Sequence, residues 1–376
     1  MLQKIKTLCK RIIDRLPGGN YIVFESEPDL SDNTKAVFDE MLRRGLNKKY
    51  RFIWWVKQVR EDLPQYPNTY YLDTATKRNE RLLSWVIFRA KCRICCNKFL
   101  TTSLQSRKSF YLTHGTALKK LNNYQVPERI QYTLVASEAV KEMMARELKG
   151  DISGFHALGY PRNDILHTAN RDLHQLLDGE YRKVIVWYPT FRQHKGGMKT
   201  GAVNALPVLH DTQAAIRLNE LAREKGVLIV VKPHFAQDIR YISDHHLSHI
   251  RFIDDGFFVR NHISSYEFVG SCDALITDYS SIYFDYLLCD KPVAVIWEDI
   301  EDYRKNPGFA LDPQFYMQGA EKIYNLEDFA AFLTNVAEGR DELSRQRQKI
   351  CGLVNYAADG QNSRRVVDFI VREANL

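Results

Sequence analysis

Short apolar runs alternate with helical patterns along almost the whole chain. The runs are rich in β-branched and aromatic residues, which is typical of buried strands. They lie at 21–26, 51–56, 92–97, 110–114 and 132–137 in the first half, and at 183–191, 227–234, 251–255, 274–278 and 292–297 in the second. The helical patterns between them lie at 33–45, 76–90, 138–150 and 211–225. This alternation predicts parallel sheets with helices on both faces.

The pattern stops in a polar stretch and then restarts, which indicates two domains. A chain of 376 residues is also longer than one hydrophobic core usually supports. We therefore predict an α/β fold of two doubly wound, Rossmann-like domains that face each other across a cleft. The predicted segments are a basic N-terminal helix at 1–17, a first domain at 18–170, a linker at 171–182, a second domain at 183–355, and a C-terminal helix at 356–376 that could pack back on the first domain.

The N-terminal segment, 1–17, has an apolar helical stripe flanked by lysines and arginines. A basic amphipathic helix of this kind can lie in a membrane interface, or it can pack on its own domain. The segment by itself favours neither alternative.

Composition places the chain among globular proteins, with 45% hydrophobic and 26% charged residues. The net charge of +7 suits an anionic partner, but it is spread along the chain, so phosphorylated substrates and an acidic membrane surface fit as well as nucleic acid. We find no signal peptide and no apolar run near the ~20 residues of a membrane span, and we expect an intracellular protein. The single Cys-x-x-Cys, at 92–95, has no second pair, so we expect core thiols and no metal site.

Polar side chains stand at the ends of several predicted strands. Ligands of doubly wound sheets bind beyond the carboxyl ends of the strands, so these positions are the candidates for binding and catalysis. They are Ser26, Glu27, His114, Arg162, Asp164, Thr190, Arg192, Lys232, His234, Asp278, Ser280 and Ser281. The sequence has neither a Walker loop nor a Gly-x-Gly-x-x-Gly motif opening a helix, which disfavours ordinary ATPases and dinucleotide enzymes.

In the first half, His114 ends an apolar run and precedes Gly115, where a ligand can approach the backbone closely. An imidazole there could act as a general base near neutral pH. A lone histidine is more often part of the core, but the following Gly-Thr and the basic pair that starts at Lys119 favour a functional role. Arg162 and Asp164 could contact substrate, or they could serve as turn and cap residues.

In the second half, Lys232 and His234 offer a cation and an imidazole to a diphosphate, and Thr190 and Arg192 offer a hydroxyl and a guanidinium. Each set alone could be a structural ion pair, but several sets at strand ends of one half favour an anion site. The stretch 278–281 could cap the following helix, or it could seat a phosphate.

The motifs together resemble one known family. "SDNTKAVFDEM", "THGTALKKL", "GYPRNDIL", "YPTFR", "LITDYSSIYFDY" and "WEDIEDYR…GFALD" occur in the order found in the CDP-glycerol glycerophosphotransferase family, from about residue 20 to about residue 315. The family comprises teichoic-acid primases and polymerases, with relatives in capsule synthesis. The resemblance implies a glycosyltransferase-B architecture that needs no metal or other cofactor, with the acceptor on the first domain and the CDP-alditol on the second.

The resemblance also assigns roles to residues. His114 and His234 match the two histidines of the family, and we predict both as catalytic. Arg192, Asp278, Ser280 and Ser281 match motifs of the family that imply donor binding, and Thr190 and Lys232 are predicted to join them from their positions at strand ends. Further substrate-binding candidates are Lys119, Arg162, Asp164 and Asp299. Thr113 stands where the family usually has tryptophan, and Phe309-Ala310 replaces its usual Phe-Tyr. These departures concern the shape of the acceptor and the identity of the alditol.

The implied reaction transfers glycerol phosphate from CDP-glycerol to a hydroxyl of a lipid-linked sugar or growing polymer and releases CMP. The resemblance places the protein in the cytoplasm, peripheral on the anionic inner face of the cell membrane, without a nucleic-acid partner. The short N-terminal region favours a primase-like or single-unit transferase. Alternatives are a CDP-ribitol-dependent transferase, an ordinary nucleotide-sugar glycosyltransferase of the same fold, and a polyanion-binding protein without enzymatic activity.

Overall fold

The computed structural model describes residues 19–101, 107–122, 124–190, 206–233, 239, 242 and 245–376. They divide into two compact units. Unit 1 comprises Met1–Thr116, Asn123–Asp164 and Asp359–Leu376, and unit 2 comprises Ala117–Asn122 and Ile165–Ala358. The chain therefore leaves unit 1 twice and returns to it twice. The predicted helix at 1–17 lies outside the described residues.

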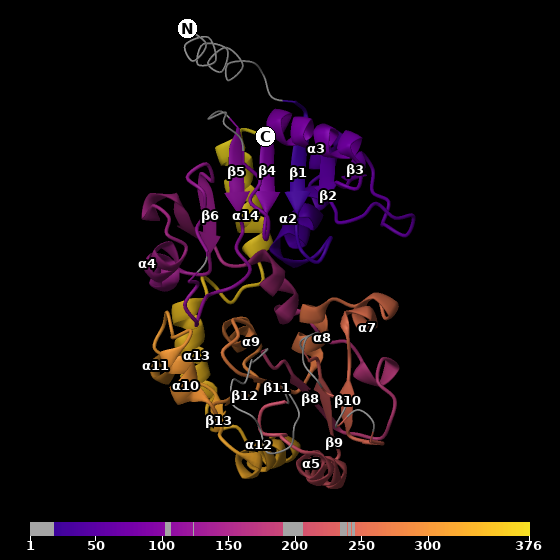
Figure 1. Cartoon of the computed structure of the whole chain (residues 1–376), viewed down its shortest axis with the longest axis vertical. Coiled ribbons are helices and arrows are strands. Elements are labelled where there is room, and N and C mark those ends of the chain that lie inside the picture. Colours follow the sequence, from indigo (N-terminus) through magenta and orange to yellow (C-terminus); the bar gives the residue numbers. More distant parts are fainter. Residues whose placement is uncertain are drawn as a thin grey trace. The chain divides into compact units, whose positions relative to one another are not determined.

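Unit 1 contains, within its described residues, a seven-stranded parallel sheet in the order β3-β2-β1-β4-β5-β6-β7 (Figure 1). The strands are Tyr21–Glu25 (β1), Arg51–Trp55 (β2), Thr69–Leu72 (β3), Cys92–Cys95 (β4), Lys108–Tyr111 (β5), Tyr132–Val135 (β6) and Phe155–Ala157 (β7). The direction of strand addition reverses between β1 and β4, and ligands of such sheets bind beyond the strand ends at this point.

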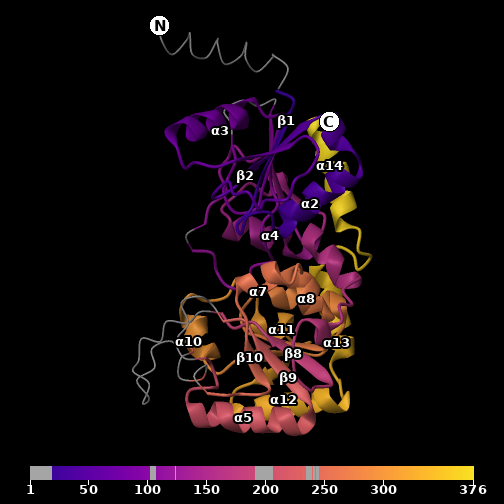
Figure 2. The same ribbon diagram turned by 90° about the vertical axis from the view of Figure 1, so that its right-hand side faces the viewer.

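Helices cover the first sheet and complete its core. They are Asp32–Arg43 (α2), Lys77–Arg89 (α3), Glu138–Glu147 (α4) and Asn362–Ala374 (α14), with 3₁₀ turns at Leu46–Lys48 (η1), Ile152–Gly154 (η2) and Pro161–His167 (η3). Helix α14, far along the sequence, lies beside α2 (Figures 1 and 2). Its side chains Val366, Val367 and Ile370 are fully buried against strands of the sheet.

Unit 2 contains a six-stranded parallel sheet, counted over its described residues, in the order β10-β9-β8-β11-β12-β13. The strands are Lys183–Trp187 (β8), Val227–Val231 (β9), Ile250–Phe252 (β10), Ala274–Thr277 (β11), Val293–Ile296 (β12) and Glu321–Ile323 (β13). The reversal point lies between β8 and β11. The two sheets thus repeat one topology, which confirms the predicted α/β fold of two Rossmann-like domains.

The helices of unit 2 vary widely in length. They are Thr212–Lys225 (α5), Asp255–Arg260 (α7), Ser265–Ser271 (α8), Ile282–Tyr286 (α9), Ile300–Lys305 (α10), Pro313–Tyr316 (α11), Leu326–Glu338 (α12) and Ser344–Val354 (α13), with 3₁₀ turns at Leu173–Gln175 (η4) and Leu287–Cys289 (η5). Helix α5 begins where Asp211 accepts the Ala214 N–H at 2.8 Å and ends at Gly226, whose φ of +64° suits glycine. Helices α5 and α12 lie side by side (Figure 2).

Three strands carry patterns too short or too polar to predict. β3 alternates buried Thr69 with exposed Tyr70, and β7 and β13 have only three residues each. Among the described residues, no helix is both long enough and apolar enough to cross a membrane.

Candidate functional site

His114 stands just beyond β5, on backbone that departs from strand geometry. Thr113 has a φ of +45°, and Gly115 has a φ of +138°. A β-branched residue in the left-handed region costs on the order of 1–3 kcal/mol, so surrounding contacts must hold it there. The Thr113 side chain is buried, and its Oγ1 donates to the Leu134 carbonyl at 2.9 Å. The His114 side chain itself is exposed.

Asn33, fully buried near the start of α2, holds this backbone through two of its carbonyls. Its Nδ2 donates to the Thr113 carbonyl at 2.9 Å and, at the longer distance of 3.4 Å, to the Leu112 carbonyl. The Cys96 thiol also donates to the Thr113 carbonyl, at 2.9 Å. These bonds join α2 and the end of β4 to the segment that carries His114.

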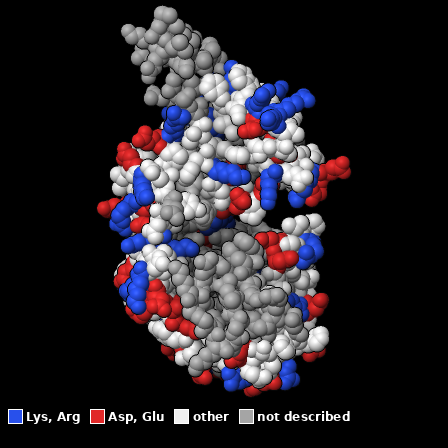
Figure 3. Space-filling view, viewed as in Figure 1, with Lys and Arg blue, Asp and Glu red and all other residues white. Residues whose placement is uncertain are grey.

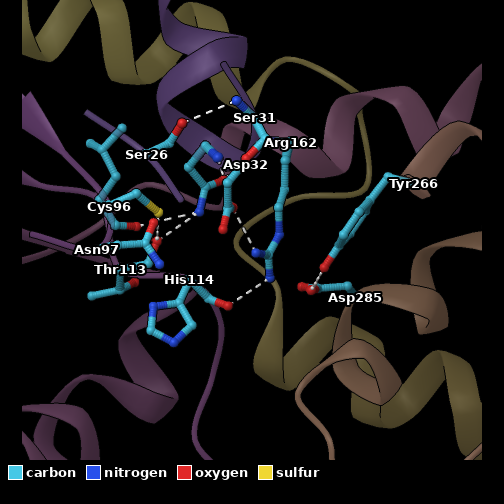
Figure 4. A network of polar contacts seen from close by, with 12 residues as sticks. Ser26, Ser31, Asp32, Cys96, Asn97, Thr113, His114, Arg162, Tyr266 and Asp285 are labelled. Atoms are coloured by element: carbon cyan, nitrogen blue, oxygen red, sulfur yellow. Dashed lines mark hydrogen bonds and ion pairs between the residues drawn. The ribbon is translucent and has the colours of Figure 1, made fainter. Parts of the chain in front are cut away.

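Arg162, in η3, holds the same segment through the carbonyl of His114 (Figure 4). Its Nη2 donates to the His114 carbonyl at 3.0 Å, and its Nη1 donates to Asp32 at 2.7 Å. The two paired side chains are only 9% and 15% exposed. The Arg162 backbone N–H donates to the Asn33 side-chain oxygen at 3.0 Å. We call Asp32, Asn33 and Arg162 the His114 clamp; in Figure 4 the imidazole points away from the guanidinium.

Asp164 caps α14. Its two carboxylate oxygens accept the backbone N–H groups of Asn362 at 2.8 Å and Ser363 at 2.7 Å. Carboxylates at helix N-termini commonly satisfy unpaired N–H groups in this way. Of the two alternatives for this residue, the observed bonds match the cap.

A buried carboxylate joins β1 to β4 at the reversal point of the first sheet. Glu25, 1% exposed, accepts the N–H groups of Cys96, Asn97 and Lys98 at 3.3, 3.1 and 2.8 Å. Burial raises the pKa of Glu25, although these three bonds oppose the shift. Beyond it, the Glu27 N–H donates to the Asn97 side chain at 2.8 Å. Ser26 Oγ donates to the Pro28 carbonyl at 2.9 Å, within the turn that leads to α2.

A second buried carboxylate occupies the reversal point of the other sheet. Asp278, 1% exposed, follows β11 and accepts the Thr190 N–H at 2.7 Å. Nearby, Thr277 Oγ1 donates to the Tyr188 carbonyl at 3.0 Å. These two bonds join the ends of β8 and β11 and hold Thr190 half-buried beside Asp278. The predicted donor-binding residue Arg192 lies outside the described residues.

Ser280 and Ser281 are half-buried at the start of α9. Ser281 is the N-cap residue, but its side chain makes no capping bond to a described residue. Ser280 Oγ accepts the Ile282 N–H at 3.5 Å, longer than the roughly 2.7–3.2 Å usual for such a bond. Helix capping therefore accounts for little of what these two hydroxyls could bind.

Lys232 follows β9 and extends its pairing with β8, because its N–H donates to the Trp187 carbonyl at 3.0 Å. Its Nζ lies 3.0 Å from Asp255 Oδ1 and 5.9 Å from the centroid of the Tyr188 ring. The aspartate is 79% exposed, so solvent weakens this pair. His234, the second predicted catalytic histidine, lies outside the described residues.

Two further predicted substrate-binding residues, Asp299 and Lys119, contact an aromatic pair in unit 2, Tyr279 and Phe309. The Tyr279 hydroxyl donates to Asp299 at 2.8 Å, and its ring lies 5.4 Å from that of Phe309. Lys119 forms an isolated antiparallel bridge with Phe309, and the Lys120 N–H donates to the Gly308 carbonyl at 3.1 Å. Phe309, next to the departure at Ala310, therefore packs against Tyr279 of the motif at 275–286, and the Ala310 N–H donates to the Leu118 carbonyl at 2.8 Å.

Nothing within the described residues forms a group of three or more His, Cys, Asp or Glu side chains able to hold a metal ion. The described cysteines are free thiols, and most are buried. Burial raises the pKa of Cys92 and of Cys95 to about 12, so neither thiol is poised to act as a thiolate.

Sequence reasoning gave no role to Asp32, Asn33, Glu25 or Tyr279. Asp32 and Asn33 stand inside the quoted motif "SDNTKAVFDEM", and an Asp-Asn pair at the start of a helix after a strand was the available signal. From the sequence alone, this pair looks like a helix cap. Its position near the end of β5 is a consequence of the tertiary fold.

Comparisons with known proteins give a consistent result. The family model described as CDP-glycerol:poly(glycerophosphate) glycerophosphotransferase matches residues 8–372. A teichoic acid poly(glycerol phosphate) polymerase of Bacillus spizizenii is 25% identical, over 98% of this chain and 96% of its own length. A teichoic acid glycerol-phosphate transferase of Staphylococcus aureus is 26% identical, over 96% and 95%.

Solved structures agree on the fold. A structure of the wall teichoic acid polymerase TagF matches with a TM-score of 0.71 at 21% identity, covering 100% of this chain and 97% of that one. A UDP-GlcNAc 2-epimerase from Neisseria meningitidis, bound to UDP-GlcNAc, matches with a TM-score of 0.51 at 14% identity, covering 94% and 99%.

Proposed function

Because the chain belongs to the CDP-glycerol:poly(glycerophosphate) glycerophosphotransferase family, we propose that it transfers glycerol phosphate from CDP-glycerol to a hydroxyl of a lipid-linked sugar or growing polymer. The family and the enzyme class predicted from the motifs, a CDP-glycerol glycerophosphotransferase, are confirmed. A role in teichoic acid synthesis is supported at the level of this class. The acceptor, and any role in capsule synthesis, belong to the proposal.

The observation that carries the proposal is the exposed imidazole of His114 on a firmly held backbone. The acceptor hydroxyl attacks the phosphorus that bears glycerol, and its proton passes to His114. The new O–P bond forms as the bond from phosphorus to CMP breaks. General-base help of this kind is typically worth ~10²–10⁴ in rate.

The donor side of the proposal rests on unit 2. Ser280, Ser281 and Lys232, together with Arg192 and His234, bind the diphosphate and stabilise the negative charge that grows on CMP as it leaves. Thr190, whose N–H donates to Asp278, is a further proposed donor contact. Positioning and electrostatic stabilisation supply most of the catalysis in phosphoryl-type transfer, so we propose that the reaction needs no metal.

Lys119 and Asp299 complete the proposed substrate contacts. The Tyr279 hydroxyl donates to the Asp299 carboxylate and so holds it in place. Lys119, a cation, pairs through its backbone with Phe309. We propose that they contact the glycerol end of the donor. The substitution itself is Ala310, which follows Phe309, and the Phe309 ring packs against Tyr279. We propose that Ala310 bears on which alditol is accepted.

A donor panel tests the function. The protein is incubated with a lipid-linked glycerol phosphate oligomer and with CDP-glycerol, CDP-ribitol, UDP-sugars or GDP-sugars in turn. We expect CMP from CDP-glycerol and an increase in acceptor mass by glycerol phosphate units. CMP from CDP-ribitol alone would favour the ribitol alternative, and UDP or GDP release would overturn the proposal. Polyanion binding without turnover, steeply weakened by salt, would favour the non-enzymatic alternative.

We further propose that the protein works at the cytoplasmic, anionic face of the membrane. Helix α3 supports this with exposed Leu82 and Trp85, 45% and 56% exposed, beside exposed Arg78 and Arg81. Figure 3 shows basic side chains gathered in the region of α3. Apolar and basic side chains together favour the interface of an anionic bilayer.

Sedimentation with phosphatidylglycerol vesicles tests the membrane proposal. We expect Trp85→Ser to bind the vesicles less well than the parent protein. Ile152→Ser is the matched control, since Ile152 is 47% exposed in the same unit and should be replaced without effect. Equal losses in both variants, or none in either, would count against α3 as the contact surface.

A further inference from the structure

We propose that the His114 clamp positions the imidazole for proton transfer, which makes Asp32, Asn33 and Arg162 positioning residues for the reaction. The inference rests on the proposed function of His114. It assigns a purpose to polar side chains that touch neither acceptor nor donor in the proposed mechanism.

The clamp bonds to the backbone of the catalytic segment and not to the imidazole. The carbonyls of Leu112, Thr113 and His114 are three successive acceptors, and each receives a bond from Asn33 or Arg162. The register of β5 with β6 ends at Tyr111, and on the β4 side the Leu112 N–H donates to the Cys95 carbonyl at 2.8 Å, so the three carbonyls lie past the paired residues. Side chains from two distant elements, α2 and η3, replace the missing strand partner.

Each residue type in the clamp suits a double task. The planar guanidinium of Arg162 reaches the Asp32 carboxylate through Nη1 and the His114 carbonyl through Nη2, which the single ammonium of lysine cannot do in the same geometry. The Asn33 amide donates to Thr113 and accepts from the Arg162 N–H, so an aspartate there would lose the donor and an alanine would lose both.

Charge balance gives Asp32 its own reason to be present. The imidazole must accept a proton and become cationic during the reaction, and an unpaired guanidinium bonded to the same residue would oppose that charge. Asp32, 2.7 Å from Arg162, neutralises it locally. The clamp therefore holds the backbone of His114 through a cation without leaving that cation uncompensated.

The alternative is that the clamp only stabilises unit 1, and a double-mutant cycle separates the two. CMP release from CDP-glycerol, with the lipid-linked glycerol phosphate oligomer as acceptor, is measured for Arg162→Gln in the parent and in a His114→Ala background. We expect kcat to fall ~10–100-fold in the parent, since a misplacement of ~1 Å can cost that much, while KM for CDP-glycerol stays within ~2-fold. Arg162→Lys should recover part of the loss. In the His114→Ala background no further loss is expected, because the two residues act as a unit.

Arg44→Gln is the matched control. Arg44 follows the other end of α2 and likewise bonds a carboxylate, Asp368 at 2.5 Å, and a backbone carbonyl, that of Arg364 at 3.0 Å. Its loss should leave kcat near the parent value in both backgrounds. A fall in kcat equal to that of Arg162→Gln would show a general structural effect and overturn the proposal.

Should Arg162→Gln fail to fold, as judged by thermal unfolding, Asp32→Asn takes its place. It keeps an acceptor for Nη1 and removes only the charge, and we expect the same pattern at ~3–10-fold. If His114→Ala leaves turnover unchanged, the proposed function of His114 fails. If His114→Ala abolishes turnover while the clamp variants leave kcat unchanged, or lower it equally in both backgrounds, the clamp proposal fails and the proposed function stands.

Discussion

The two units share one sheet topology but differ in how their polar side chains are bonded. In unit 1 the sheet reverses between β1 and β4, and Glu25 of β1 accepts N–H groups of the turn after β4. In unit 2 the direction is opposite, since Asp278 follows β11 and accepts the N–H of Thr190 beyond β8. Both side chains are buried, so each sheet closes its reversal point with an internal carboxyl group.

The polar side chains beyond these carboxylates differ in how fully they are hydrogen-bonded within their own unit. Around His114 the side chains of Asn33 and Arg162 bond other described groups of the same unit. In unit 2, Ser280 makes one long bond and Ser281 makes no capping bond to a described residue. The first arrangement suits holding one catalytic group still, and the second suits receiving a ligand.

The largest expected effect is that of His114→Ala. Loss of the proposed general base should lower kcat by ~10²–10⁴ while leaving the affinity for CDP-glycerol unchanged, because the proposed donor-binding residues belong to unit 2. Turnover by CMP release and affinity by isothermal titration calorimetry measure the two separately. Lost donor binding with preserved turnover would reverse the assigned roles of the units.

Replacement of both donor-motif serines should act on binding instead. Hydrogen bonds to charged groups contribute ~1.5–3 kcal/mol each, so Ser280→Ala with Ser281→Ala should weaken CDP-glycerol binding at least tenfold. The free energy of unfolding should hardly change, because neither hydroxyl forms a good cap.

Ser264 provides the contrast for the serine variant. It caps α8 by accepting the Glu267 N–H at 3.0 Å, so Ser264→Ala should cost ~1 kcal/mol of stability and leave donor binding intact. If the double variant behaved like Ser264→Ala, the two hydroxyls would be caps and not phosphate ligands.

A lysine at each end of the second sheet sharpens the comparison further. Lys232→Met should weaken CDP-glycerol binding by about tenfold, because a cation beside the diphosphate is lost. Lys183→Met removes a similar ion pair, 2.9 Å from Asp273, at the opposite end of the strands, and should leave binding unchanged. Calorimetric titration of both variants decides the matter, and equal effects would indicate a non-specific role of charge.

The smallest expected effect concerns pH and Glu25. Its raised pKa means that the folded state holds the proton more tightly than the unfolded state, so stability falls as pH rises from about 4.5 through the folded-state pKa. Each unit of pKa difference is worth about 1.4 kcal/mol. Glu25→Gln removes this titration, so the decline in melting temperature above pH 4.5 that we expect for the parent should be absent from the variant. An unchanged pH profile would contradict the assignment.

Sequence patterning predicted the longer elements well and the short ones poorly. The apolar run at 227–234 and the helical pattern at 211–225 correspond to β9 and α5. β13, three residues with two of them only half-buried, has no periodicity that could distinguish it from a loop. The return of α14 to unit 1 depends on whether its apolar face packs on the first sheet or on the second. Tertiary packing decides this, and the sequence pattern of the helix does not.

The candidate site was predictable to a similar degree. The strand-end rule selected His114, Thr190, Lys232 and Asp278, because parallel strands present their carboxyl ends at one edge. It could not tell a ligand-binding group from a structural one: Arg162 and Asp278 bond backbone atoms in the fold. Nor could it find Asn33, since the amide's role depends on the approach of α2 to β5.

Helix α14 has a consequence for biogenesis. Unit 1 obtains Val366, Val367 and Ile370 from a segment translated only after all of unit 2, so a nascent chain exposes this face of the sheet to solvent in the meantime. A ribosome-bound or recombinant fragment ending at residue 358 should recruit chaperones or aggregate, and adding residues 359–376 in trans should rescue it. The order of synthesis thus makes the amino-terminal half the last to mature.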